Sequence, residues 1–216
     1  MGKVIGITGG VASGKSTVAQ MLVSEGAQII DADKICHRLL ENSEVKNLIR
    51  ERWGNKVEDE NGTINRHVLG NIVFSDRKEL SALNQIIHPR AIKLIKSKIH
   101  ELTVNGETDL IVIDAALLVE TNLIDLCDKI LFVKTSRDIC EKRAQVYRKW
   151  PLCEIEKRER FQDSIKDKMQ TADIIINNDF SKADTFKQVK DFLKQFITNL
   201  QFGGNNGYSK NESTTN

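Results

Sequence analysis

Long apolar runs are missing from this sequence of 216 residues. A membrane-spanning helix needs about 20 consecutive apolar residues, and the apolar runs here are much shorter. The first residues also lack the apolar segment of a secretory signal peptide. We therefore expect a cytoplasmic protein with no membrane partner.

A marked excess of one charge is missing as well, because 32 basic residues nearly balance 30 acidic ones. A protein that mainly neutralises nucleic-acid phosphates carries a large basic surplus. We therefore expect no nucleic-acid partner, although a local basic pocket remains compatible with this balance, and we predict no obligate protein partner. Hydrophobic residues make up 40% and charged residues 29%, which is typical of one globular domain.

Cysteine is scarce, and none of the four cysteines forms a Cys-x-x-Cys pair or has histidines at zinc-site spacing. We expect reduced thiols with structural or incidental roles. The cysteines are Cys36, Cys127, Cys140 and Cys153.

The guanine-reading run Asn-Lys-x-Asp is also missing, which disfavours a nucleotide-dependent switch.

Five short apolar segments, separated by helical ones, predict buried strands. This alternation predicts the α/β class, with a five-stranded parallel sheet wrapped by helices. The helical stretch between the second and third strands is too long for a simple crossover and predicts an inserted lobe beside the sheet. We expect it to break at Gly54, at a turn over 60–62 and at Pro89. The expected strands are 3–8, 27–30, 109–113, 129–134 and 173–177.

These segments predict one domain over residues 1–200. Residues 203–216 contain almost nothing to bury and predict a disordered tail. Within the domain we expect a core formed by 1–35, 108–142 and 170–200, a helical substrate lobe over 36–107, and a lid over 143–169 between the fourth and fifth strands.

The segment from Gly9 to Ser16 matches the phosphate-binding pattern Gly-x4-Gly-Lys-Ser/Thr without a mismatch. Its glycines let backbone N–H groups turn toward phosphate oxygens, and the following helix adds the positive end of its dipole. Lys15 is expected to reach the β- and γ-phosphates, and the Ser16 hydroxyl to bind Mg²⁺. A preceding strand and a following helix favour this reading over a chance match. The predicted ATP-binding residues are Ala12, Ser13, Gly14, Lys15, Ser16 and Thr17.

Carboxylates follow two of the predicted strands. Asp31 and Asp33 follow the second strand, and Asp114 follows the third. Ligands of open α/β sheets bind at the carboxyl ends of strands. Asp33 is therefore the predicted base for an attacking hydroxyl, and Asp114 the predicted magnesium carboxylate. The alternatives are helix capping for Asp31 or Asp33 and a structural role for Asp114.

A polar stretch between the fourth and fifth strands carries several arginines. Mobile arginines close over the triphosphate in small phosphoryl-transfer enzymes. For each single arginine, pairing with nearby glutamates on a solvated helix face remains an alternative. The arginines considered are Arg143, Arg148, Arg158 and Arg160.

Together these motifs resemble the dephospho-CoA kinase family. The similarity includes the opening from Ile7 through Asp33, the run Gly62–Arg66, Asn84 with His88-Pro89, Asp114–Glu120, and the pattern from Gln162 to Asn178. It covers nearly all of residues 3–200. Departures include Ala12, Asn65, Ala116 and Val119, and the segment 147–153, which differs from the usual lid sequence.

The resemblance implies a P-loop kinase that transfers the γ-phosphoryl group of ATP, with Mg²⁺, to the 3′-hydroxyl of dephospho-CoA. It implies Asp33, Lys15 and Arg143 as catalytic residues. The implied substrate-binding residues are Asp33, Arg66, His88 and Leu118, although His88 could equally be a buried structural histidine. Ser16 and Asp114 are the implied metal-binding residues. Another P-loop nucleoside or nucleotide kinase is the alternative function.

Overall fold

The computed structural model describes residues 2–106, 108–121, 123–151, 154–160 and 165–202. Helices and strands alternate along the chain as the sequence predicts. The expected tail, 203–216, lies outside the described residues. The elements are β1 (Lys3–Gly9), α1 (Lys15–Ser24), β2 (Gln28–Asp31), α2 (Ala32–Leu39), α3 (Ser43–Trp53), η1 (Asn55–Val57), α4 (Arg66–Val73), α5 (Arg77–Val104), β3 (Leu110–Asp114), η2 (Leu123–Leu126), β4 (Lys129–Lys134), α6 (Arg137–Arg148), α7 (Glu154–Glu159), α8 (Ile165–Gln170), β5 (Ile174–Asn177) and α9 (Lys182–Phe202).

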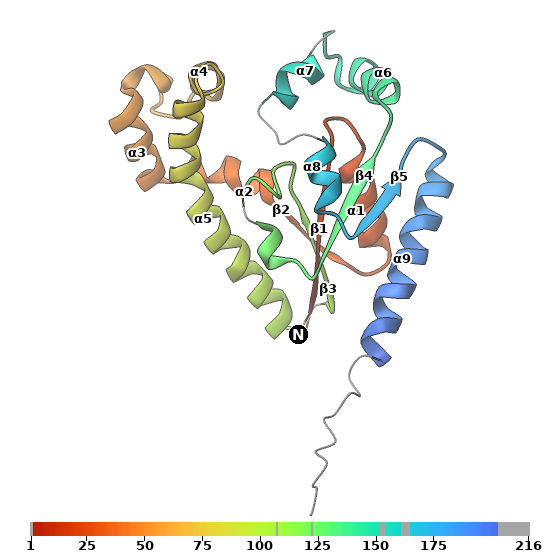
Figure 1. The fold of residues 1–216 in the computed structure, drawn as a ribbon. Helices are drawn as coiled ribbons and strands as arrows, with labels where there is room; N and C mark the ends of the chain where they lie inside the picture. The colour runs from red at the N-terminus through yellow and green to blue at the C-terminus, as the bar shows by residue number, and fades with distance from the viewer. Residues whose placement is uncertain (1, 107, 122, 152–153, 161–164, 203–216) are drawn as a thin grey trace, which may run out of the picture.

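The five strands form one parallel sheet in the order β2-β3-β1-β4-β5. The predicted α/β fold with a five-stranded parallel sheet is confirmed. β1 lies in the middle, and all strands end at the same edge, at the top of Figure 1. The register places Asp31 opposite Asp114 at the ends of β2 and β3. Two of the carboxylates singled out in the sequence are therefore neighbours.

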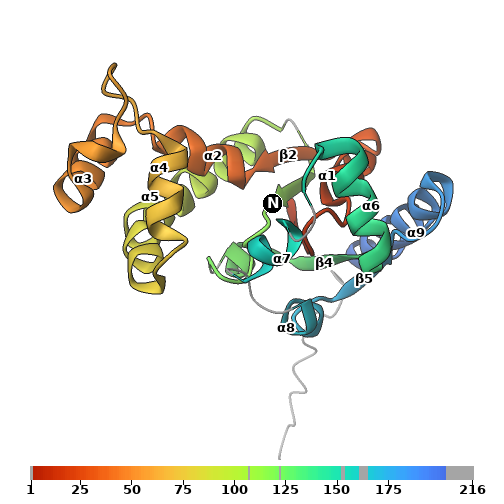
Figure 2. The same cartoon turned by 90° about the horizontal axis from the view of Figure 1, so that it is seen from above.

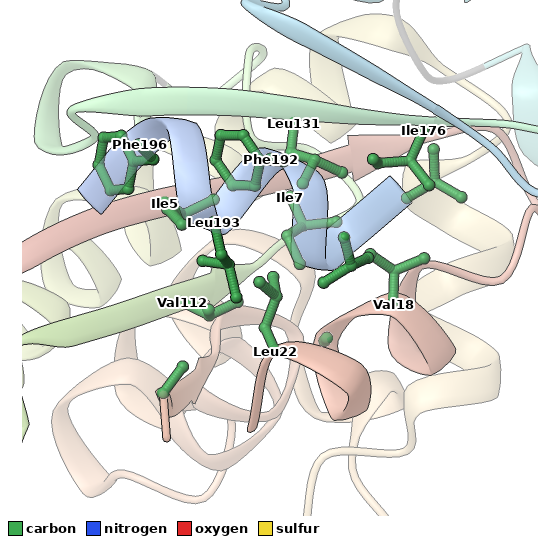
Figure 3. Packing of buried hydrophobic residues seen from close by; sticks show 14 residues of the cluster. Ile5, Ile7, Val18, Leu22, Val112, Leu131, Ile176, Phe192, Leu193 and Phe196 are labelled. Atoms are coloured by element: carbon green, nitrogen blue, oxygen red, sulfur yellow. The ribbon is translucent and has the colours of Figure 1, made fainter. Parts of the chain in front are cut away.

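Both faces of the sheet are covered by the apolar faces of helices. On one face, α1 and α9 pack over the middle strands (Figure 3), and Phe192 stacks on Phe196 with ring centroids 5.6 Å apart. On the other face, the second half of α5 buries Ile95 and Leu102 against β2, β3 and β4. The central strands are thus buried on both faces, which explains why they contain almost continuous apolar runs.

The helical segment between β2 and β3 has a core of its own. Side chains from α2 to α5 pack together around Trp53, Ile49 and Ile87. Figure 1 shows α3 and α4 standing to one side of the sheet, with α5 running from them down to it. Seen from above in Figure 2, this segment lies on one side of the strand ends and α6 lies on the other.

The predicted break at Pro89 is wrong, because Pro89 lies inside α5, which is one continuous helix of 28 residues. Pro89 has no backbone N–H, so the helix loses one hydrogen bond there. Buried side chains on both sides of the proline, among them Ile87 and Ala91, hold the two halves in one stripe. Arg90 also donates a side-chain hydrogen bond to the Ile86 carbonyl oxygen at 2.8 Å. The predicted breaks at Gly54 and at 60–62 coincide with turns between helices.

Across the described part of the chain, none of the helices combines the length and apolar character needed to span a membrane.

Candidate active site

A cleft of about 1220 Å³ opens at the carboxyl ends of the strands. The phosphate loop and the ends of β2 and β3 form its floor. α4 and α5 line one side, and α6 and α7 line the other. All the predicted ATP-binding residues line this cleft, together with Asp33, Asp114, Arg143 and His88. In the sequence these residues are spread over as many as 131 positions, from Ala12 to Arg143, and the fold brings them together around one cleft.

The phosphate loop begins where β1 ends and is shaped by residues with positive φ. Gly14 has a φ of 92° and Ala12 a φ of 60°. The Lys15 amino group lies over the loop and donates hydrogen bonds of 3.2 Å to the carbonyl oxygens of Gly9 and Gly10. Burial lowers the pKa of Lys15, while the nearby carboxylates of Asp114 and Asp33 oppose this shift. The loop therefore positions a cation at the centre of the cleft.

A second group of side chains supports the loop from beneath. The carbonyl oxygen of Ser13 accepts hydrogen bonds from Thr135 (2.8 Å), Arg143 (3.2 Å) and Asn178 (2.8 Å). The Thr185 hydroxyl in turn donates to the side-chain oxygen of buried Asn178 at 3.0 Å. The sequence pattern gave Asn178 no role. The available signal was a polar residue directly after a strand at the ligand edge.

Ser16 and Asp114 meet at the floor of the cleft. The Ser16 hydroxyl donates a 3.4 Å hydrogen bond to the Asp114 carboxylate. Burial raises the pKa of Asp114, and Asp33 and Asp31 reinforce this rise while Lys15 opposes it. A hydroxyl beside a carboxylate, facing a triphosphate-sized cleft, is a donor set that suits Mg²⁺, which prefers oxygen ligands and retains several waters. These residues therefore fit the predicted metal.

Asp33 and Asp31 have different roles in the structure. Asp31 is the N-cap of α2 and accepts a 2.8 Å hydrogen bond from the Lys34 backbone N–H. Asp33 lies in the first turn of α2 and faces the cleft. The loss of hydration raises the pKa of Asp33, and Asp31 adds to this rise, whereas Lys15 opposes it. The capping alternative thus applies to Asp31. The Asp33 side chain instead faces the cleft, where its charge interacts with that of Lys15.

The arginines between β4 and β5 separate into two groups. Arg143 lines the cleft, yet its guanidinium is bonded to the carbonyl oxygens of Ser13 and Asn178. Arg148 and Arg160 also line the cleft, and Arg148 stacks on the Trp150 ring at 4.7 Å. The side chain of Arg158 lies outside the described residues. Arg143 therefore has a direct contact with the phosphate loop.

Two of the substrate-binding predictions are not supported by the structure. Leu118 is fully buried in the core beneath β3 and does not line the cleft, whose surface here is formed by its neighbours Ala116 and Leu117. Arg66 is exposed, outside the cleft lining, and lies 3.7 Å from Glu41. His88 does line the cleft, and partial burial lowers its pKa.

A buried lysine from α8 was not predicted to act in the site. Lys168 has a side chain only 1% exposed and forms a 2.8 Å ion pair with Glu120. It also donates a 2.8 Å hydrogen bond to the carbonyl oxygen of Ala116. Sequence patterns could not distinguish this lysine from the many exposed ones, because its partners lie about 50 residues earlier in the chain.

The three described cysteines are free thiols, as expected. Burial raises the pKa of Cys36 to about 11 and that of Cys127 to about 12. Both thiols are therefore protonated at neutral pH and are poor nucleophiles.

Comparison with known proteins matches residues 3–184 to the dephospho-CoA kinase family model. A dephospho-CoA kinase from Fusobacterium nucleatum is 38% identical over 191 residues, which is 88% of this chain and 97% of the relative. One from Carboxydothermus hydrogenoformans is 37% identical, covering 89% and 94%. The solved dephospho-CoA kinase from Campylobacter jejuni superimposes with a TM-score of 0.67 at 27% identity, covering 93% and 100%.

The fold is also shared more widely. Shikimate kinase from Acinetobacter baumannii superimposes with a TM-score of 0.52 at 14% identity, covering 92% of this chain and 95% of that one. This likeness concerns the P-loop kinase fold alone. The match over residues 3–184, together with relatives of this identity and coverage, decides the assignment. This chain belongs to the dephospho-CoA kinase family.

Proposed function

We propose that this enzyme transfers the γ-phosphoryl group of ATP to the 3′-hydroxyl of dephospho-CoA, the last step of coenzyme A synthesis, with Asp33 as general base. The hydroxyl oxygen forms a bond to the γ-phosphorus, and the bond from that phosphorus to the β,γ-bridging oxygen breaks. The hydroxyl proton passes to the Asp33 carboxylate, and ADP leaves. Most of the rate enhancement comes from positioning and charge neutralisation.

One observation carries the proposal: Asp33 and Lys15 face the same cleft from β2–α2 and from the phosphate loop. In this proposal Lys15 binds the transferred phosphoryl group. Asp33, in the first turn of α2, is close enough to Lys15 for the two charges to interact. An acceptor hydroxyl between the two would reach both the base and the phosphorus. Its raised pKa makes Asp33 a stronger base than an exposed aspartate.

Ser16 and Asp114 are the residues that would hold Mg²⁺, with the triphosphate and water completing its shell. When bound, the ion neutralises charge on the β- and γ-phosphate oxygens. Ser13 and Gly14 present the loop backbone to the phosphates, and Arg143 holds that backbone through the Ser13 carbonyl oxygen. We therefore assign Arg143 to support of the loop.

The α4 and α5 side of the cleft is the proposed dephospho-CoA site. It presents amide, imidazole and aromatic groups, which suit a nucleotide with a polar arm. Arg148, Lys157 and Arg160 line the opposite side, and we propose them as lid cations for the triphosphate. The residues on the acceptor side are Asn71, Phe74, Asn84 and His88. A cytoplasmic location and the lack of other partners stay predictions from the sequence.

The test is ATP-dependent conversion of dephospho-CoA to CoA, measured for wild type, Asp33→Asn and Asp31→Asn. We expect Asp33→Asn to lower kcat by about 10²–10⁴ while ATP affinity changes little. Asp31→Asn is the matched control, because asparagine caps a helix as well as aspartate does. Turnover of Asp33→Asn within about twofold of wild type, outside the general-base range, would remove Asp33 from this role. Adenosine and AMP as acceptors test whether the hydroxyl of dephospho-CoA is selected.

A further inference from the structure

The short helix α7 packs against both the phosphate loop and α6. Ile155 of α7 is buried in a small apolar cluster that also contains Val11 of the phosphate loop. Cys140 and Ala144 of α6 complete the buried part of this cluster. Figure 1 shows α7 next to α6, above the strand ends. The phosphate loop, α6 and α7 therefore share one apolar contact.

A single arginine adds polar contacts between α6 and α7. Arg137, the first residue of α6, lies 2.7 Å from the carboxylate of Glu141 in α6 and 2.5 Å from that of Glu159 in α7. A further carboxylate of α7, that of Glu156, lies 3.7 Å away. One exposed ion pair contributes little to stability. A planar guanidinium shared by several carboxylates, however, fixes their relative positions, because its N–H groups point in set directions.

The residues of α7 divide around the helix axis according to their contacts. Glu156 and Glu159, three positions apart, contact Arg137. Lys157 and Arg160, also three positions apart, line the cleft. The Arg160 backbone N–H donates to the Glu156 carbonyl oxygen at 3.2 Å, so this turn is still helical. Because residues three apart share a helix face, one side of α7 is tied to α6 and the neighbouring side presents cations to the cleft.

The carboxylate of Glu159 also lies beside the phosphate loop. One of its oxygens is 3.9 Å from the position that a Cβ on Gly10 would occupy. An unpaired carboxylate at this place would repel a bound triphosphate. Replacing Arg137 would therefore have two separable effects, since it would release α7 and leave the charge of Glu159 unpaired.

We propose that Arg137 is a positioning residue, which holds α7 through Glu156 and Glu159 so that Lys157 and Arg160 point at the triphosphate of ATP. This proposal rests on the proposed function in assigning Lys157 and Arg160 to the triphosphate. It adds that their direction is set from α6, by a side chain outside the cleft lining.

The experiment compares Arg137→Met, Glu159→Ala and the double variant of the two. Turnover gives kcat and the KM for each substrate, and calorimetry gives the affinity for a non-hydrolysable ATP analogue. Hydrogen exchange of the segment 154–160 measures how firmly α7 is held. Arg50→Met is the matched control, because Arg50 is similarly exposed and forms a 2.7 Å ion pair with Glu58, outside the cleft lining.

In Arg137→Met we expect kcat to fall by about tenfold, as a small misplacement of groups near the reaction would cause. The affinity for the ATP analogue should fall as well, and hydrogen exchange of 154–160 should become faster. The KM for dephospho-CoA should stay near that of wild type. Glu159→Ala should show the same changes, because it removes the same contact from the other partner, whereas Arg50→Met should show none of them.

The double variant separates positioning from charge repulsion. If Arg137 positions α7, the double variant is as impaired as Arg137→Met, because both lack the same link. If Arg137 only neutralises Glu159, Glu159→Ala binds the ATP analogue at least as tightly as wild type, and the double variant regains wild-type kcat. Either of these last two results would overturn the proposal.

A second comparison asks whether Arg137 acts through the cations of α7. Arg137→Met is introduced into a protein that already carries Lys157→Ala and Arg160→Ala. The loss caused by Arg137→Met should vanish there, because the side chains that it positions are gone, whereas a merely structural residue would cause the same loss in both backgrounds. Equal losses would contradict the proposal. Should Arg137→Met fail to fold, Glu159→Ala in the same two backgrounds supplies the comparison.

Failure of this proposal differs from failure of the proposed function. If dephospho-CoA is not the acceptor, wild type forms no CoA, and the affinity for the ATP analogue and the hydrogen exchange still decide the role of Arg137. If Arg137 has no such role, wild type forms CoA, and Arg137→Met matches it in kcat, analogue affinity and exchange.

Discussion

The side-chain amide of Asn178 donates a 2.8 Å hydrogen bond to the carbonyl oxygen of Ser13, 165 positions earlier in the chain. The same nitrogen lies where a Cβ on Gly14 would come within 2.4 Å. The phosphate loop is thus closed against Asn178, and a glycine at position 14 is required both by its φ of 92° and by this contact.

Replacing Asn178 with alanine should weaken ATP binding by about tenfold, the effect of losing roughly one buried hydrogen bond. The reason is that the Ser13–Gly14 backbone loses a partner that holds it in the phosphate-binding shape. Calorimetric titration with an ATP analogue gives the affinity, and the KM for dephospho-CoA should stay the same. Asn61→Ala, in a turn of the helical segment, is the control. Equal weakening toward both substrates would indicate general unfolding.

Lys15→Ala should nearly abolish turnover while the fold stays intact. Lys15 is the cation that the loop places over the phosphate site, and its amino group contacts only loop carbonyl oxygens among the hydrogen bonds of the described structure. Turnover and circular dichroism are compared with Lys98→Ala, an exposed lysine paired with Glu101. Normal turnover in a well-folded Lys15→Ala protein would contradict the assignment of the loop.

Activity should fall on the acid side at a pH above the ordinary aspartate pKa. The general base must be ionised, and the pKa of Asp33 is raised by the loss of hydration and by Asp31. Asp114 shifts in the same direction, so the profile reflects both groups. The measurement is log kcat/KM against pH under saturating Mg²⁺. An acid limb at the ordinary aspartate value would count against a raised pKa.

The raised pKa of Asp33 also affects stability. Activity should increase with pH as Asp33 ionises, whereas the free energy of unfolding should decrease. Because the folded state holds the Asp33 proton to higher pH than the unfolded state does, unfolding free energy decreases as pH rises through that interval. Asp33→Asn removes this effect. We therefore expect its melting temperature at neutral pH to be no lower than that of wild type, with the difference vanishing at low pH. A clear drop at neutral pH would mean that the carboxylate stabilises the fold.

Pro89→Ala should raise the melting temperature. A proline within a helix removes one hydrogen bond and crowds the preceding turn, at a cost of about 3 kcal/mol, only partly offset by the restricted unfolded chain. Pro89 is exposed, so alanine leaves no cavity. Thermal unfolding of wild type and Pro89→Ala decides the sign. A lower melting temperature would show that the helix geometry at Pro89 is required for packing of α5.

The strands and the phosphate loop could be predicted because their signals are local. The predicted strand over 129–134 coincides with β4. The phosphate-binding pattern is complete within the eight residues Gly9–Ser16, so it can be recognised without knowledge of the fold. The continuation of α5 through Pro89 could not be predicted, because it depends on packing around Ile87 and Ala91, which no local preference contains.

For the site residues as well, features with a local sequence signal could be predicted, and features that depend on tertiary contacts could not. That Asp33 and Asp114 line the cleft could be predicted because they lie at or just after the ends of β2 and β3, whereas Leu118 was assigned from a motif without knowledge of which way its side chain points. After β3, the side chains of Ala116 and Leu117 line the cleft, whereas those of Ala115 and Leu118 are buried. Leu118 falls on the core side. The contacts of Lys168 and Asn178 could not be predicted, because their hydrogen-bond partners lie far away in the chain.

The support of the phosphate loop from beneath has a consequence for the order in which the protein is made. The loop is among the first segments to leave the ribosome, yet Thr135, Arg143 and Asn178 follow more than 120 residues later. Until then the nascent chain contains the whole nucleotide motif but lacks the bonds that shape it. We therefore expect the phosphate loop to reach its ATP-binding shape only late in synthesis.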